Sequence, residues 1–183
     1  MLGRAAARPG GDAVTWRLGT SAQLHDGADL VLMSCNVAMH ILGDDWHHTL
    51  AAITKSLAPG GTVVFESRNP DARAWATWNE PVSERETPAG LLRESLTTDP
   101  PNEDGVVVMH CWNEFPESGD VIEGELLLQF RSHEQVVADL RRAGLEPLST
   151  HRNWQGDPFT GGTDQRLMIF RASSRSVPDG GDA

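Results

Sequence analysis

The segment from Ala28 to Ser67 restricts the possible folds more than any other part of the chain. Its first seven residues, ADLVLMS, are apolar almost without interruption, which is typical of a strand covered on both faces. A helix is predicted next, starting at Asp44 or Asp45 and stopping at Pro59–Gly61, because apolar side chains recur at helical steps. These side chains are Trp46, Leu50, Ile53 and Leu57. With the apolar strand TVVFES at residues 62–67, the pattern predicts a right-handed parallel βαβ unit.

The flanking segments extend this unit into a larger α/β domain. Upstream, VTWRL at Val14–Leu18 is rich in β-branched and aromatic residues and is closed by Gly19, which predicts a short strand. Downstream, three strand-like runs alternate with the turn-rich segments DPPNEDG and PESGD. The runs are Leu91–Thr98, Val106–Phe115 and Val121–Phe130. They predict an antiparallel meander inserted after the parallel core, at about residues 87–130.

A second helix and two further strands are predicted after the meander. Ser132 and Gln135 match a capping box, and Gly144 ends the helix. The apolar positions of this helix share one face: Val136, Leu140 and Ala143. The strands expected after it are Leu145–Asn153 and Gln165–Ala172. We therefore expect one domain over residues 1–172 and a polar, mobile tail over residues 173–183.

Composition narrows the class of partner. Of the 183 residues, 39% are hydrophobic and 22% are charged, which is typical of a folded domain. The net charge of −11 repels phosphate backbones, so a small-molecule substrate is expected and nucleic acid is not. No apolar run approaches the roughly 20 residues of a membrane span, and the N-terminus lacks the apolar core of a signal peptide. These features predict a cytoplasmic protein without a membrane partner, whose Cys35 and Cys111 stay reduced.

Three segments carry a resemblance to a known family: ADLVLMSCNVAMHIL, LAAITKSLAPGGTVVFESRNPDARAW and FRSHEQVVADLRRAGLEPL. Together with the order of the predicted elements, they resemble class I S-adenosylmethionine-dependent methyltransferases. The resemblance covers roughly residues 1–172. It implies a partial Rossmann-like methyltransferase sheet with an inserted antiparallel meander. It also implies S-adenosylmethionine as the cofactor and a small molecule as the methyl acceptor.

The N-terminal segment MLGRAAARPGG lacks two features that the resemblance implies. In the family, a glycine-rich loop after the first strand contacts the cofactor, and an acidic residue after the second strand binds the ribose. The glycine cluster at Pro9–Gly11 precedes a predicted strand instead of following one. We therefore expect the chain to correspond to the C-terminal part of a methyltransferase, with its activity alone in doubt. The alternative is a non-catalytic remnant or binding module, and in either case the strand at Ala28–Ser34 would form an exposed edge prone to self-association.

The resemblance assigns roles to two groups of residues but to no catalytic residue. The residues expected to bind the cofactor are Thr20, Ser21 and Ala22 at the adenine, and Cys35, Asn36 and Val37 at the methionine arm. The residues expected to bind the acceptor are His40, Arg68, Trp75 and Trp78. Because the sulfonium donor is already activated, methyl transfer depends mainly on the position of the acceptor.

Each assignment has a structural alternative. His40 can be an ordinary half-buried histidine, Asn36 can satisfy loop backbone groups, and Trp75 and Trp78 can be packing residues. Arg68 can pair with an acidic neighbour, Glu66 or Asp71. A zinc site at His40, Asp44, His47 and His48 is disfavoured, because adjacent helical residues diverge by about 100°. A hydrolase is disfavoured because no G-x-S-x-G motif is present.

Overall fold

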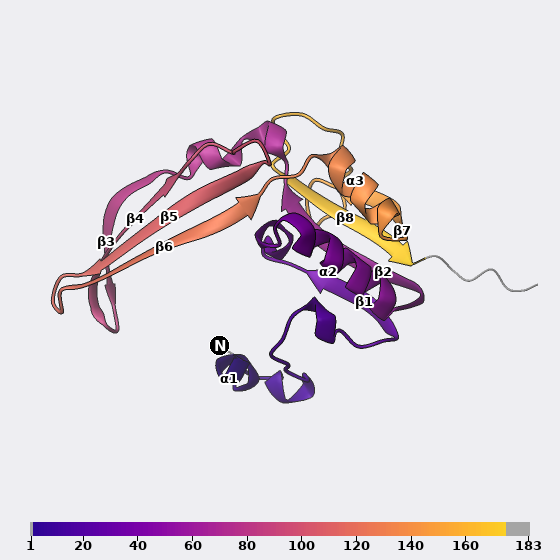
Figure 1. Cartoon of the computed structure of the whole chain (residues 1–183). Helices are drawn as coiled ribbons and strands as arrows, with labels where there is room; N and C mark the ends of the chain where they lie inside the picture. Colours follow the sequence, from indigo (N-terminus) through magenta and orange to yellow (C-terminus); the bar gives the residue numbers. More distant parts are fainter. Residues whose placement is uncertain (1, 175–183) are drawn as a thin grey trace, which may run out of the picture.

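The computed structural model describes residues 2–174 and contains two four-stranded sheets (Figure 1). The strands of the first sheet, in spatial order, are β1 (Ala28–Met33), β2 (Leu57–Arg68), β8 (Leu167–Ser174) and β7 (Leu145–His151). The strands of the second are β3 (Glu80–Thr87), β4 (Gly90–Thr98), β5 (Val106–Phe115) and β6 (Asp120–Gln129). The predicted α/β class with an inserted antiparallel meander is confirmed. Of the predicted tail, residues 175–183 lie outside the described residues.

The parallel unit forms as predicted, except that the helix ends at Ser56 and Leu57, predicted in its apolar stripe, is the first residue of β2. Strands β1 and β2 pair in parallel, with Val31 opposite Val63 and Met33 opposite Phe65, and helix α2 (Gly43–Ser56) connects them. The start of the helix differs from the prediction, because Leu42 is the N-cap and no side chain caps it. Asp44 and Asp45 lie instead in the first turn, where carboxylates stabilise a helix through its dipole.

Helices α2 and α3 (His133–Arg142) pack on one face of the first sheet, where they build the main core. The ring of Trp46 meets Phe65 edge-on at 5.5 Å between centroids, and Phe65 stacks on Phe170 at 5.3 Å. The indole Nε1 of Trp46 donates to Asp139 Oδ2 at 3.0 Å, which ties α2 to α3. The predicted capping box of α3, Ser132 with Gln135, is present.

Burial in this core predicts a graded response to removing one methylene group. The Ile53→Val variant is expected to lower the free energy of unfolding by about 1 kcal/mol, because Ile53 is fully buried in α2. The matched control is Ile122→Val on the exposed surface of β6, where we expect a change within about 0.5 kcal/mol. Urea unfolding of both variants checks this difference, and equal losses would contradict the assigned core.

Two predictions about the N-terminal part are wrong. VTWRL forms no strand, and no strand pairs with β1 on its outer side within residues 2–174. Trp16 instead donates its indole N–H to the Gly11 carbonyl at 2.8 Å, within its own segment. Strand β1 is also not covered on both faces, since Leu30 is 58% and Leu32 is 54% exposed. Because both helices lie on the opposite face, the apolar composition of β1 does not reflect two-sided burial.

The meander begins earlier than predicted. Strand β3 (Glu80–Thr87) pairs with β4 and adds a fourth strand to the three expected. Two short 3₁₀ helices, η4 (Pro70–Ala72) and η5 (Ala74–Thr77), connect it to β2. As Figure 1 shows, the meander extends away from the first sheet as a separate layer.

Candidate functional site

A cavity of about 640 Å³ lies beside the open edge of β1. Its walls come from the 3₁₀ helix η2 (Ser21–Gln23), strand β1, the 3₁₀ helix η3 (Val37–His40) and helix α2. The wall is mainly apolar, with polar side chains from η2, η3 and α2 at several points. An apolar cavity with a few polar groups, at the carboxyl end of a parallel strand, is suited to binding a small molecule.

Five of the residues expected from the sequence line this cavity: Thr20, Ser21, Ala22, Val37 and His40. The turn at η2 is held by its own side chains. Thr20 Oγ1 accepts from the Ala22 N–H at 3.3 Å, and the Gln23 side chain completes a capping box. Ser21 Oγ lies 3.2 Å from Thr49 Oγ1, which links η2 to α2. Thr20, expected at the adenine, therefore uses its hydroxyl to hold the turn.

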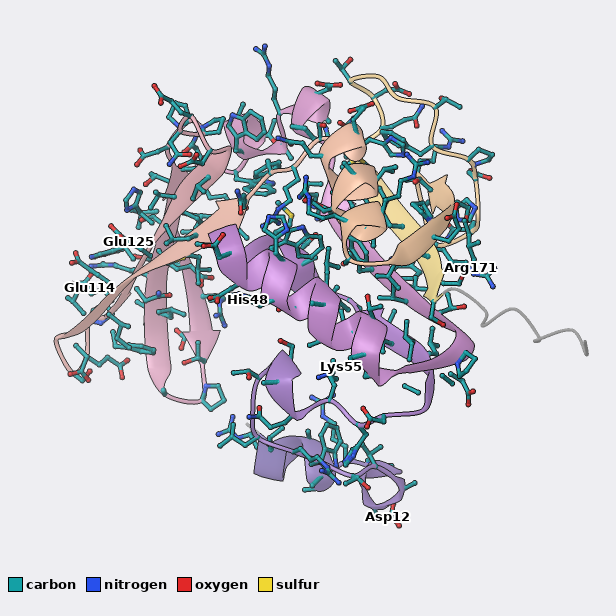
Figure 2. The ribbon with its side chains drawn as sticks, turned by 45° about the vertical axis from the view of Figure 1, so that its right-hand side comes forward. Asp12, His48, Lys55, Glu114, Glu125 and Arg171 are labelled. Carbon is teal, nitrogen blue, oxygen red and sulfur yellow. The ribbon has the colours of Figure 1, made fainter. Side chains whose placement is uncertain are left out.

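Several lining residues were not expected from the sequence. Helix α2 contributes Asp45, His48 and Thr49, and His48 projects from it in Figure 2. These positions flank the buried stripe that starts at Trp46, so the helix uses one face for the core and the adjoining face for the cavity. The helical spacing contained this signal, because residues next to an apolar stripe face its border.

The loop after β1 has an unusual backbone. Cys35 and Asn36 have φ values of 60° and 59°, so two consecutive non-glycine residues adopt the left-handed conformation. Such residues are strained and cluster at binding sites. The loop is held by the Asn36 N–H, which donates to Glu66 Oε1 at 2.9 Å. Cys35 and Asn36 do not line the cavity, so their contact with the methionine arm stays a prediction.

The expected acceptor residues are not all brought together. Arg68 ends β2 at the same sheet edge as Asn36, and within residues 2–174 it pairs with neither Glu66 nor Asp71. Trp75 and Trp78 pack on Phe130, at 4.7 and 5.9 Å between ring centroids, beyond the cavity wall. This is the packing role that the sequence left open, and an additional role at the acceptor stays a prediction.

Arg131 supports the site and was missed by sequence reasoning. Its side chain is only 7% exposed, and its guanidinium lies 4.5 Å from the centre of the Trp46 ring. It donates to the carbonyls of Ala38, at 3.3 Å, and Ile41, at 2.7 Å. Burial lowers the pKa of Arg131 to about 10, while the charge of Asp139 opposes this shift. Since this pKa remains well above 7, a charged arginine holds η3, and with it His40, in place.

The histidines of α2 point to different partners. His47 Nδ1 lies 4.0 Å from Asp139 Oδ1, whereas His48 Nδ1 lies 4.0 Å from Asp45 Oδ1. In the part of the chain that the structure describes, no group of three or more His, Cys, Asp or Glu side chains is placed to hold a metal ion. None of the helices between residues 2 and 174 is both long and apolar enough to cross a membrane.

Comparisons with known proteins show which solved structures share this fold. No protein-family model and no curated protein sequence matches the chain. The CcbJ methyltransferase from Streptomyces caelestis is similar in structure, with 22% identity and a TM-score of 0.73 over 95% of this chain and 69% of that one. An S-adenosylmethionine-dependent methyltransferase from Clostridium acetobutylicum matches with 13% identity and a TM-score of 0.68, over 87% of this chain and 64% of that one.

A third structure is an amino pentose methyltransferase from Micromonospora echinaspora, involved in calicheamicin biosynthesis and solved with S-adenosylmethionine bound. It shares 18% identity and has a TM-score of 0.55, over 87% of this chain and 61% of that one. The chain thus spans between 61% and 69% of the length of these three structures. Over that span it has the fold of class I S-adenosylmethionine-dependent methyltransferases, as the resemblance implied.

Proposed function

We propose that this chain forms part of an S-adenosylmethionine-dependent methyltransferase that acts on a small molecule. The observation that carries the proposal is the cavity at the carboxyl end of β1, with Ala22, Val37 and His40 in its wall. The volume of about 640 Å³ is within the range of small-molecule sites. The similar solved structures are methyltransferases, and one of them acts on an amino pentose.

The chain's own residues would supply binding and orientation. The apolar side chains of Val31, Met33 and Ile53 would exclude water from a bound ring, while Ser21 and Thr49 offer hydroxyls at the wall. When bound, S-adenosylmethionine supplies an activated methyl group. His40 is exposed in η3 beside Val37, where it can contact an acceptor or accept its proton.

Binding of S-adenosylmethionine to these 183 residues alone is expected to be weak. The glycine-rich loop and the ribose-binding acid that the resemblance implies do not precede β1 in this sequence. Loss of two charge-assisted hydrogen bonds costs about 3 kcal/mol or more, which is at least about 100-fold in affinity. Isothermal titration measures this affinity, and a dissociation constant in the low micromolar range would refute the expectation.

The site of binding is a separate test of the function. In a ¹⁵N-labelled sample, excess S-adenosylmethionine is expected to shift the amide signals of Ala22 and Val37. The Ala22→Trp variant fills the cavity and should abolish these shifts, whereas Ala89→Trp on the exposed β3–β4 hairpin should leave them unchanged. The proposal fails if saturating cofactor shifts neither signal or shifts only signals elsewhere.

The second candidate is a binding module without catalysis, which is favoured by the exposed side of β1. Its apolar side chains Leu30 and Leu32 are suited to contact another polypeptide. This candidate is distinguished by the same titration, because a module without cofactor chemistry gives no cofactor-dependent shift at Ala22 or Val37.

A further inference from the structure

Two buried polar atoms without partners lie where strands β1 and β2 end. They are Asn36 Oδ1 and Arg68 Nε, for which residues 2–174 provide no hydrogen-bond partner. These strands are parallel neighbours, so Asn36 and Arg68 both lie at the carboxyl end of the first sheet. An unsatisfied buried polar group costs free energy, and native structures keep few of them. A pair at one sheet edge therefore needs an explanation.

The nearest carboxylate is already occupied. Glu66 is only 8% exposed, and it accepts from the Asn36 N–H at 2.9 Å and from the Trp154 indole N–H at 2.8 Å. Each carboxylate oxygen thus has a neutral donor, and Arg68 lies beyond 4.0 Å, forming no ion pair within the described residues. Since side chains two positions apart on a strand share a face, Glu66 and Arg68 point to the same side of β2.

Four of the described arginines form ion pairs with carboxylates: Arg85, Arg93, Arg142 and Arg152. Arg68 is not among them, and its Nε is also buried without a hydrogen-bond partner in the described residues. Arg68 instead keeps its charge free at the sheet edge where ligands bind in parallel α/β folds.

From these two unpartnered atoms we infer that Arg68 and Asn36 form a subsite for a carboxylate that carries a neighbouring hydroxyl or amino group, on the methyl acceptor. Asn36 then serves the acceptor instead of the methionine arm expected from the sequence. The guanidinium of Arg68 would donate to the carboxylate, which is the anion its planar donors match best. Asn36 Oδ1 would accept the hydroxyl or amino hydrogen. This inference rests on the proposed function for the identity of the ligand as acceptor, but the subsite itself is defined by the two side chains.

The left-handed backbone at Asn36 supports the same assignment. Asn36 and Cys35 are held in a strained conformation by the bond to Glu66, which fixes where the Asn36 side chain projects. Glu66 in this reading is a positioning residue: it orders the loop and does not contact the carboxylate.

The subsite is tested directly on the Arg68 side chain. The Nε–H of each arginine gives its own ¹H–¹⁵N signal, and the Arg68 signal is identified by its loss in the charge-conserving Arg68→Lys variant. Three compounds are titrated at constant ionic strength. Lactate carries the carboxylate and the neighbouring hydroxyl, acetate carries the carboxylate alone, and lactamide carries the hydroxyl beside a neutral amide. We expect lactate to shift the Arg68 signal, acetate to bind about five-fold more weakly, and lactamide to have no effect.

Variants assign each half of the subsite. Asn36→Gly tolerates the positive φ and should remove the five-fold preference for lactate while acetate binding is unchanged. In Arg68→Lys, lactate binding followed at the Asn36 amide should weaken about ten-fold, whereas the control Arg171→Lys on the exposed surface should bind as the parent does. The inference is overturned if lactate leaves the Arg68 signal in place, or if the Arg171 signal moves equally. Failure of the cofactor titration alone would refute the methyltransferase proposal and leave this subsite standing.

Discussion

Replacing Arg131 by methionine is expected to lower the free energy of unfolding by about 4 kcal/mol. Methionine retains the apolar stem but leaves the carbonyls of Ala38 and Ile41 without their donor, at about 1–3 kcal/mol each. The contact between the guanidinium and the Trp46 ring is also lost, at about 2 kcal/mol for a desolvated pair. Relief of the cost of burying the charge offsets part of this sum.

Urea unfolding followed by circular dichroism measures the loss. The control is Arg171→Met, because Arg171 is exposed on β8 (Figure 2) and should change stability by less than about 0.5 kcal/mol. Arg131→Lys should fall between the parent and the methionine variant, since lysine keeps the charge but not the planar fork. If the free energy of unfolding of Arg131→Met lies within about 1 kcal/mol of that of the parent, η3 does not depend on Arg131.

The purified chain is expected to self-associate through β1, so that its mass in solution exceeds the 19.9 kDa of one chain. Strand β1 is an edge of the first sheet, and exposed Leu30 and Leu32 add an apolar surface to its unpaired backbone. Exposed, apolar edges of this kind pair with other chains. The other edge strand, β7, is less suited because Pro147 lacks an N–H and a register shift interrupts the pairing there.

Light scattering with size-exclusion chromatography tests this expectation. Leu32→Lys places a charge on the β1 edge and should restore the mass of one chain, whereas Leu148→Lys on β7 should not. Hydrogen exchange should show protection at Ala28–Met33 that disappears in Leu32→Lys. A parent chain that is already monomeric, or one that becomes monomeric only in Leu148→Lys, would contradict association through β1.

The parallel unit and the cap of α3 could be predicted because their signals are local. The apolar stripe of α2 and the capping box of α3 each lie within one element. The strand predicted at VTWRL is wrong because its formation depends on a distant partner. A short strand is stable only beside another strand, whereas this segment forms a hydrogen bond within itself, from Trp16 to Gly11. Strand β3 was missed because EPVSERET is rich in glutamate, which is depleted in strands. It is held by cross-strand ion pairs, Arg85 with Glu94 and Glu84 with Arg93, that only its pairing with β4 creates.

The site residues also differ in whether the sequence could predict them. Val37 and His40 could be placed because they follow the carboxyl end of the parallel strand β1. Thr20–Ala22 also line the cavity, although the VTWRL segment before them forms no strand. Arg131 could not, since its partners Ala38 and Ile41 lie 93 and 90 positions away in the sequence. Its burial among carbonyls arises only when the end of the meander returns to η3.

The contact of Trp75 and Trp78 with Phe130 has a consequence for how this fold diversifies. These residues lie on the segments that lead into and out of the meander, so the two connections meet at one aromatic junction. An insertion whose ends are close together can be lengthened, shortened or replaced without displacing the strands that flank it. The meander can therefore be exchanged as a unit. Recombination at this junction, in evolution or in protein engineering, would give the protein a new surface while the first sheet stays unchanged.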